Sequence, residues 1–177
     1  YCRTNSGCDF YLGSARLAAP AYLKHFKRHR ILFIITMADT PMNFDLITLF
    51  PEIFAALDHG IVGRAQRNQL LELNYWNPRD YTQDTHKTVD DRPYGGGPGM
   101  VMKYEPLHAA MQAAKASSDT PAKIVHLTPQ GKVLTQADLA HFQNTRLILV
   151  AGRYESIDER LLAEDIDEEW SIGDYVL

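Results

Sequence analysis

Hydrophobic and polar positions alternate along residues 44–163 in a way that predicts strands and helices in turn. Residues 44–50 are mostly apolar and rich in strand-forming side chains, which is typical of a buried strand. Shorter apolar segments predict further strands over 73–76, 122–127 and 147–151. These four segments are the expected strands of one sheet.

Helices are predicted between these strands. Pro51 begins the first helix, because proline favours the first turn, and the apolar side chains after it share one face: Ile53, Phe54 and Leu57. The segment 106–115 has four apolar side chains at helical spacing: Leu107, Ala110, Met111 and Ala114. Shorter helices are predicted over 64–71, 136–142 and 157–163.

This order of elements predicts an α/β domain with a mostly parallel sheet and helices on both faces. Binding sites in such sheets lie at the carboxyl ends of the strands. Residues 127–131 and 152–155 sit at or just after the ends of two predicted strands. We therefore expect a ligand to bind next to these two segments.

Charge is unevenly distributed along the 177-residue chain, whose net charge is −4. Residues 1–41 carry six Lys or Arg and two acidic side chains, whereas residues 42–177 carry twelve and twenty. The basic run 24–30 could bind RNA as an arm, although short basic runs are common. An acidic body that handles RNA needs a local basic patch or a basic additional domain.

Cysteine usage and apolar runs bear on the compartment. Cys2 and Cys8 are the only cysteines, and they indicate neither an oxidising compartment nor a metal site. The apolar run 31–35 is too short to cross a bilayer and lies too far from the start for a signal peptide. We therefore expect a cytoplasmic protein that has no membrane partner and no bound metal.

The segment 89–100 is the most unusual of the chain, because six of its last eight residues are Gly or Pro. Such a composition excludes a helix or a strand interior. The segment also holds side chains that can bind a polar ligand: Asp90, Asp91, Arg92 and Tyr94. A binding loop is therefore favoured over a plain turn. A nucleotide-phosphate loop is disfavoured, since no Lys-Ser/Thr pair follows and Pro98 removes a backbone donor.

Several motifs follow one another in a fixed order from about residue 42 to residue 177. Besides the segment 89–100 they are 49–54, 60–65, 76–81, 127–131, 152–155, 157–160 and 167–177. Together they resemble the bacterial tRNA (guanine-N1)-methyltransferase (TrmD) family, whose members modify guanine 37, 3′ to the anticodon. So many motifs in one order are far more specific than a single Gly-rich loop.

The resemblance implies a domain organisation. Residues 42–177 are expected to form the S-adenosylmethionine-binding methyltransferase domain, with the trefoil knot of the SPOUT methyltransferases at its C-terminal end, although knots are rare. Residues 1–41 have no counterpart in the family and are expected to be an N-terminal extension. The domain is expected to be incomplete at its C-terminus, and the family's C-terminal tRNA-binding domain to be absent.

The resemblance places S-adenosylmethionine against three loops. The residues implied in its binding are His126, Leu127, Pro129, Gly152, Glu155, Ile172, Gly173, Asp174, Tyr175, Val176 and Leu177. Glu155 could recognise a ribose hydroxyl or the methionine ammonium. Arg153 could bind the ligand or pair with Asp158 and Glu159. The acidic run 167–169 before the third loop is by itself typical of a solvated surface.

The Gly-rich segment is expected to bind tRNA through four side chains: Asp90, Asp91, Arg92 and Tyr94. Arg92 could clamp a phosphate or stack on a base, and either aspartate could accept hydrogen bonds from guanine N1–H and N2–H₂. Nearby polar residues could extend this surface: Asp84, His86 and Lys87.

The implied reaction transfers a methyl group to guanine N1 while a base removes the N1 proton. In the family this base lies beyond the motif that ends here at Leu177, so no catalytic residue is assigned. The family acts as a homodimer whose subunits share the active site, and the 177 residues alone are expected to be inactive.

Two other functions remain open at this point. One is a knotted methyltransferase that acts on another RNA position, which the segment 89–100 disfavours because it resembles the guanine-N1 family specifically. The other is an RNA-binding fragment without catalysis, which the acidic body disfavours.

Overall fold

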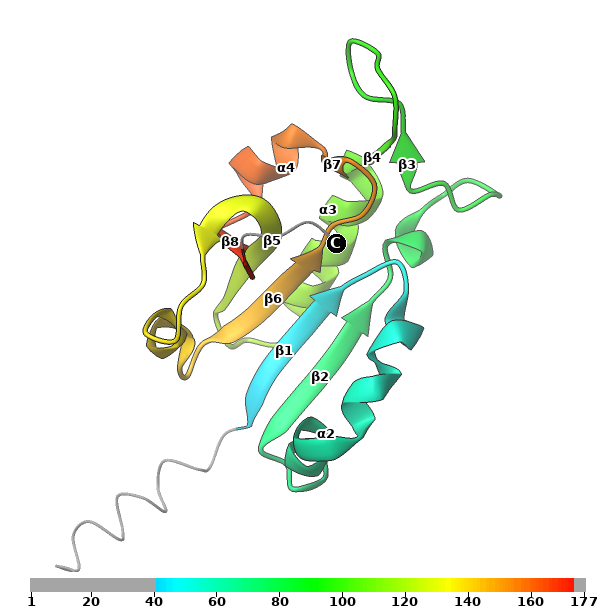
Figure 1. Ribbon diagram of the computed structural model, residues 1–177. Helices are drawn as coiled ribbons and strands as arrows, with labels where there is room; N and C mark the ends of the chain where they lie inside the picture. The colour runs from blue at the N-terminus through cyan, green and yellow to red at the C-terminus, as the bar shows by residue number, and fades with distance from the viewer. Residues whose placement is uncertain (1–40, 174–177) are drawn as a thin grey trace, which may run out of the picture. The chain divides into compact units, whose positions relative to one another are not determined.

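The computed structural model describes residues 41–173. Five strands form a parallel sheet in the order β2-β1-β6-β5-β8 (Figure 1). Their bounds are β1 Met42–Ile47, β2 Leu71–Trp76, β5 Ala122–Val133, β6 Arg146–Ala151 and β8 Glu168–Ser171. The predicted α/β domain with a mostly parallel sheet is confirmed. The basic run 24–30 and residues 174–177 lie outside the described residues.

A second, smaller sheet has the order β3-β4-β7, with β3 at Asp90–Asp91, β4 at Val101–Met102 and β7 at Ser156–Ile157. Strands β3 and β4 are antiparallel, and β7 runs parallel to β4. The segment 89–100 is therefore not loop throughout, because its first aspartates form a strand. The hairpin projects past the carboxyl ends of the main strands (Figure 1).

One face of the main sheet is covered by α3 (Tyr104–Ala116) and α4 (Glu159–Glu164). The four apolar residues predicted to share a face of α3 are all buried. They pack with Ile124, Ile148 and Val150 of the central strands. This is the larger of the two hydrophobic clusters, and it fixes α3 and α4 beside the carboxyl ends of the strands.

The opposite face is covered mainly by 3₁₀ helices. η2 (Pro51–Asp58) contacts it through Phe54, whose ring centre lies 5.8 Å from that of Tyr75. η4 (Asp138–Phe142) contributes Phe142, which packs edge-on against Trp170. Helical segments thus lie on both faces, as predicted, although neither of these two is an α-helix.

The first predicted helix differs from the observed one in its packing. Ile53, Phe54 and Leu57 were expected on one buried face, but η2 buries no residue and Ile53 is 59% exposed. A 3₁₀ helix has three residues per turn, so Phe54 and Leu57 share a half-buried face, whereas Ile53 points away from it. The apolar pattern therefore indicated a helix and two of the three residues on its inner face.

The helix predicted over 64–71 is observed four residues earlier, as α2 (Gly60–Arg67). Gly60 has φ +65°, and Gly63 packs so closely on the Asp58 carbonyl that a side chain there would collide with it. The sequence pattern did not indicate that these two glycines belong to the helix, which begins at Gly60 against η2. The chain then turns at Gln69, with φ +57°, so that Leu71 already belongs to β2.

Strand β5 is longer than the predicted segment 122–127. Its register with β8 shifts between Leu127 and Lys132, and its second half pairs with β8 again at Val133. The motif 127–131 therefore forms an irregular turn within one strand. η3 (Pro78–Tyr81) completes the elements, and no helix between residues 41 and 173 is long and apolar enough to cross a membrane.

Candidate functional site

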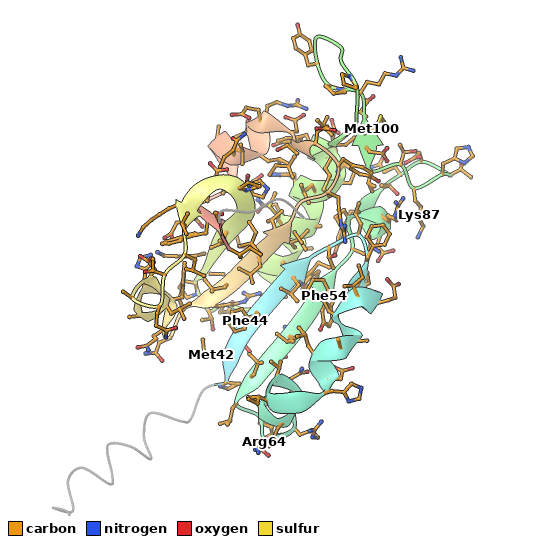
Figure 2. The ribbon with its side chains drawn as sticks, viewed as in Figure 1. Met42, Phe44, Phe54, Arg64, Lys87 and Met100 are labelled. Atoms are coloured by element: carbon orange, nitrogen blue, oxygen red, sulfur yellow. The ribbon has the colours of Figure 1, made fainter. Side chains whose placement is uncertain are left out.

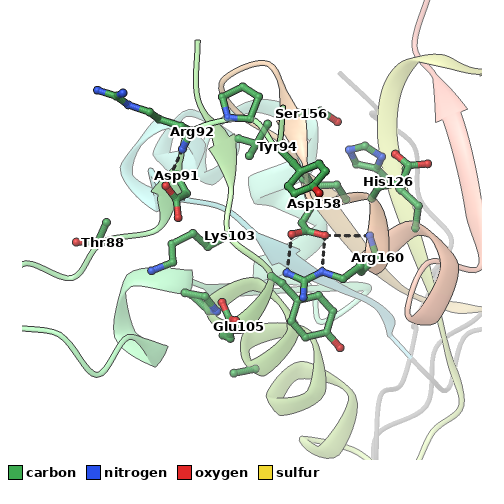
Figure 3. A pocket seen from close by; sticks show the side chains of 18 of the residues that line it. Thr88, Asp91, Arg92, Tyr94, Lys103, Glu105, His126, Ser156, Asp158 and Arg160 are labelled. Carbon is green, nitrogen blue, oxygen red and sulfur yellow. Dashed lines mark hydrogen bonds and ion pairs between the residues drawn. The ribbon is translucent and has the colours of Figure 1, made fainter. Parts of the chain in front are cut away.

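A cleft of about 1050 Å³ lies between the projecting hairpin and the carboxyl end of β5. The hairpin, the start of α3, strand β5 and the start of α4 supply its walls. Figure 3 shows Asp91 and Arg92 on one side of this view, Asp158 and Arg160 near the centre, and His126 on the other side. The cleft thus faces the end of the sheet at which a ligand was predicted.

Pairing between β4 and β7 brings the Gly-rich segment against the loop that follows β6. The Glu155 amide donates to the Met100 carbonyl at 3.0 Å. A side chain on Gly99, whose φ is +87°, would overlap the side chain of Glu155. The two segments singled out from the sequence are therefore direct neighbours, and Gly99 permits their close approach.

His126 lies at the base of the cleft, almost fully buried in β5. Its Nδ1 is 3.4 Å from Glu169 Oε1 of β8. Burial lowers the pKa of His126, and the nearby Glu169 carboxylate only partly offsets this. A Cβ on Gly152 would lie 3.2 Å from His126 Nε2, so the missing side chain leaves that nitrogen room to meet a ligand. The result is a neutral imidazole at the end of two parallel strands.

The residues implied in cofactor binding are not all brought to the cleft. His126 lines it, and Gly152 and Glu155 lie close by. Leu127 instead packs into the hydrophobic cluster on the η4 face of the sheet, and Pro129 is exposed. Ile172 is 59% exposed, and Gly173 is half-buried beside Ser171. Asp174, Tyr175, Val176 and Leu177 lie outside the described residues.

Three of the four residues implied in tRNA binding line the cleft: Asp91, Arg92 and Tyr94. Asp91 is exposed, and its carboxylate accepts from the Arg92 amide at 2.7 Å, which leaves the other oxygen free to accept. Tyr94 is fully exposed near the hairpin tip. Asp90 pairs with Met102 in the small sheet and does not line the cleft.

The loop before the hairpin contributes Asp84 and Thr88 to the cleft, whereas His86 is exposed and Lys87 pairs with Asp80. The Asp84 carboxylate accepts from the Thr88 hydroxyl at 2.6 Å and from the Thr88 amide. These hydrogen bonds lower the pKa of Asp84. The carboxylate thus closes a turn, and only part of the predicted surface extension reaches the cleft.

One interpretation of the sequence paired Arg153 with Asp158. The structure contradicts this pairing. Its guanidinium carbon lies 5.2 Å from the centre of the Phe50 ring. Asp158 pairs instead with Arg160, two residues along, and also caps α4 by accepting from the Arg160 amide at 3.0 Å. The hydrogen bonds from Arg160 lower the pKa of Asp158.

The acidic run 167–169 is partly solvated, because Asp167 and Glu169 are exposed, but its carboxylates also have hydrogen-bond partners. Asp167 accepts from the Ile124 amide at 2.8 Å, and Glu168 accepts from Lys123, His141 and Trp170. Burial would raise the pKa of Glu168, but these hydrogen bonds outweigh it and lower that pKa to about 2. Glu169 lines the cleft. Successive side chains of a strand point to opposite faces of the sheet, and this rule could have indicated that the three acids point in different directions.

Sequence reasoning also missed residues at the starts of α3 and α4 that line the cleft: Lys103, Tyr104, Glu105, Asp158 and Arg160. Arg160 was noted only as part of a motif, and Asp158 only as part of that motif and as a possible partner of Arg153. No local signal shows that the start of α3 and the start of α4 meet, because their contact depends on the order of the strands.

The donor set around His126 suits a nucleoside-like ligand that carries a positive charge. The neutral imidazole can hydrogen-bond a base edge, and the carboxylates of Glu169 and Glu155 can attract an ammonium or sulfonium group. Among residues 41–173, no three His, Cys, Asp or Glu side chains are grouped closely enough to bind a metal ion.

Comparison with known proteins identifies the family. The family model described as "tRNA (Guanine-1)-methyltransferase TrmD" matches residues 42–177. A tRNA (guanine-N(1)-)-methyltransferase of Coxiella burnetii (strain Dugway 5J108-111) is 61% identical over 133 residues, covering 75% of this chain and 54% of the relative. One from Shewanella sediminis is 58% identical over 138 residues, covering 77% and 57%.

A solved structure agrees with these relatives. The crystal structure of the tRNA (m1G37) methyltransferase from Aquifex aeolicus superposes with a TM-score of 0.68 at 33% identity, covering 78% of this chain and 62% of that one. The chain spans about half the length of the curated relatives that it matches. It belongs to the tRNA (guanine-N1)-methyltransferase family.

Proposed function

We propose that the protein containing this chain transfers a methyl group from S-adenosylmethionine to N1 of guanine 37 in tRNA. The observation that carries the proposal is the family match over residues 42–177, together with a cleft that joins the Gly-rich hairpin to the ends of the parallel strands. Related proteins are named for this reaction, and the Aquifex neighbour for this position.

The hairpin supports selection of guanine. Asp91 is exposed, lines the cleft and has an oxygen free to accept. A carboxylate facing N1–H and N2–H₂ would accept two hydrogen bonds from guanine, whereas adenine offers no such donor pair. Arg92, on the same wall, would bind the negatively charged backbone.

The methyl donor is assigned to the side of the cleft formed by His126, Gly152 and Glu155. S-adenosylmethionine supplies the reactive methyl group on its sulfonium. The residues of the chain position the two reactants: Gly152 leaves room beside the neutral His126, and Glu155 lies against the hairpin that would hold the guanine. Alignment of this kind accounts for a large part of the rate in transfers between two bound substrates.

We extend the proposal to the assembly. Phe50, Ile53 and Tyr154 are large apolar or aromatic side chains that remain exposed, and Arg153 stacks on Phe50. An apolar patch of this kind is a surface that a second subunit would cover, and a homodimer in which each active site takes residues from both chains is expected. The trefoil knot and a place in the cytoplasm, where tRNA is processed, belong to the same proposal.

The test uses the full-length protein, labelled S-adenosylmethionine and two tRNA transcripts that differ only in carrying guanine or adenine at position 37. Label on N1 of guanine 37, and none on the adenine transcript, is the expected result.

The variant Asp91→Asn should lower kcat/KM for tRNA by tenfold or more, because the loss of one charged hydrogen-bond partner removes about 1.5–3 kcal/mol.

Other outcomes would decide against the proposal. Label at another RNA position would assign the chain to a methyltransferase of different specificity. Binding of tRNA without any transfer would make it an RNA-binding protein.

A further inference from the structure

Arg160 presents a fixed and planar guanidinium group to the cleft (Figure 3). Its Nε and NH2 donate to Asp158 Oδ1 and Oδ2 at 2.9 and 2.8 Å. The guanidinium carbon lies 4.6 Å from the centre of the Tyr104 ring. One edge and one face of the group are therefore held, while 61% of the side chain remains exposed to solvent.

Tyr104 is itself held in place by contacts between α3 and α4. Its hydroxyl donates to the Glu164 carboxylate, which raises the pKa of Tyr104 to about 12 and keeps the hydroxyl protonated. The Tyr104 ring also stacks on His108, with ring centres 5.2 Å apart and planes 12° from parallel. Tyr104 thus connects Arg160 to His108 in one stacked cluster.

The stack rests on a buried carboxylate. His108 Nδ1 lies 2.7 Å from Asp165 Oδ2, and the Gln112 amide donates to Asp165 Oδ1 at 2.8 Å. Asp165 is buried, so its two partners satisfy both oxygens and fix the imidazole ring. The orientation of the Arg160 plane is consequently set before any ligand binds.

The chemistry of this group favours a nucleobase over a phosphate. Asp158 already neutralises the Arg160 charge and occupies two of its five N–H donors, so the net attraction for a second anion is reduced. A guanidinium plane is weakly hydrated and stacks readily on aromatic rings. Proteins that read single-stranded RNA loops stack splayed bases on aromatic side chains and Arg planes.

The cleft has room for more than the reacting groups. Its volume of about 1050 Å³ is at the upper end of the range for small-molecule pockets. Arg92 and Lys103 line the same cleft and carry positive charges suited to the RNA backbone. An RNA loop that places guanine 37 against Asp91 brings its neighbouring nucleotides to the same cleft.

We infer that Arg160 is a stacking platform for one of the two bases that flank guanine 37. The inference rests on the proposed function and deepens it. Arg160 acts as a positioning residue, because stacking on the neighbouring base fixes the RNA loop in which the target guanine lies.

The test measures binding of the full-length protein to anticodon stem-loop RNAs in which nucleotide 36 or 38 is either normal or abasic. Removal of one flanking base should weaken binding about tenfold, which is the usual effect of losing one stacked base. The variant Arg160→Lys keeps the charge but has no planar face, so it should weaken binding of the normal RNA about tenfold. It should weaken binding of the matching abasic RNA less than twofold.

Arg64→Lys is the matched control, because Arg64 lies on α2 at the far end of the domain from the hairpin (Figure 2). It should change every affinity less than twofold. S-adenosylmethionine affinity should stay unchanged in both variants, which separates loss of stacking from general damage to the fold.

The inference would be overturned if Arg160→Lys weakened binding of the abasic RNAs as much as binding of the normal RNA. The two losses of affinity would then be additive, as expected for a merely structural role that affects all RNAs alike. Equal binding of normal and abasic RNAs by the unaltered protein would also overturn it, without any variant. If either of these results is found and the unaltered protein still methylates guanine 37, the proposed function stands and only the stacking role fails. If it does not methylate guanine 37, the proposed function itself fails.

Discussion

Asp45 and Arg146 form an ion pair that is almost completely inaccessible to solvent. Arg146 Nε donates to Asp45 Oδ2 at 2.8 Å, and the Trp76 indole donates to Asp45 Oδ1 at 2.9 Å. The guanidinium also donates to the Ala114 carbonyl and the Ser117 hydroxyl at the end of α3. This network connects β1, β2, β6 and α3 at the end of the sheet away from the cleft.

The variant Asp45→Ala should lower the free energy of unfolding by about 3–5 kcal/mol, because it leaves the Arg146 charge buried without its partner. Chemical denaturation monitored by Trp fluorescence measures this. Asp80→Ala is the control, since Asp80 and Lys87 form an exposed pair that contributes at most about 1 kcal/mol. Equal losses in the two variants would contradict the structural role of the buried pair.

His126 gives the fold a pH dependence of known sign. Burial lowers its pKa below the value of 6.5 that it has when unfolded, so the unfolded chain takes up this proton first as the pH falls. The stability contributed by neutral His126 is therefore fully present above pH 6.5 and decreases below it. Each pKa unit of difference corresponds to about 1.4 kcal/mol.

The variant His126→Gln should remove this part of the pH dependence while it keeps a hydrogen-bonding side chain. The free energy of unfolding should decrease less between pH 7.5 and 5.5 in the variant than in the unaltered protein. An NMR titration of the His126 ring checks the cause directly. A ring pKa above 6.5 would show that the Glu169 carboxylate outweighs burial, and the predicted sign would be wrong.

Single residues show how far sequence reasoning reached. Asp45 is a polar residue inside an apolar strand, but its partner Arg146 lies 101 residues away, and nothing local connects them. His126 was found because it precedes a motif at a strand end. Arg160 was overlooked because its importance depends on Tyr104, which belongs to another helix.

At the scale of elements, the irregular turn within β5 connects the main sheet to the cleft. A Cβ on Gly131 would lie 2.5 Å from the Trp170 amide nitrogen, and the neighbouring Glu169 backbone is almost as close. Because these close atoms belong to the backbone, no change of a side-chain rotamer can relieve the overlap. The glycine is required for β5 to pass β8 at this distance.

Gly131→Ala should therefore destabilise the domain by about 1–3 kcal/mol, the usual range for overpacking a close contact. It should also weaken binding of S-adenosylmethionine, since a displaced β8 moves Glu169 away from His126. Thermal unfolding and calorimetric titration of the full-length protein measure the two effects. Gln130→Ala, at an exposed neighbour, should stay within about 0.5 kcal/mol.

Elements dominated by long apolar periodicity were predicted well, and short ones were not. The segment 106–115 lies within α3, and 147–151 within β6, because their core contacts are continuous. The helix over 64–71 was misplaced, since the close contact of Gly63 with the Asp58 carbonyl, which lets the helix begin at Gly60, is not visible in the sequence. β3 and β7 could not be predicted, because two-residue strands exist only through pairing with β4.

At the scale of the whole molecule, the charge distribution divides the chain into a basic segment, residues 1–41, and an acidic segment, residues 42–177. Residues 42–177 are strongly acidic, and the cations that line the cleft are few: Arg92, Lys103 and Arg160, of which the last is paired with Asp158. RNA affinity that depends on so few free cations should change only weakly with salt. The basic run 24–30 would add to this affinity if it formed part of the RNA-binding surface.

Removal of residues 1–40 tests whether that run contributes. The family model matches the chain only from residue 42, and the residues lining the cleft begin at Tyr81. We therefore expect the shortened protein to keep its kcat/KM for tRNA and its unfolding temperature. Filter binding between 50 and 200 mM salt provides the sharper measurement, because each phosphate contact that is lost lowers the salt slope by about 0.7–0.9. An unchanged slope would leave the cleft as the RNA site, whereas a smaller slope with weaker binding at low salt would show that the basic run is an RNA-binding arm.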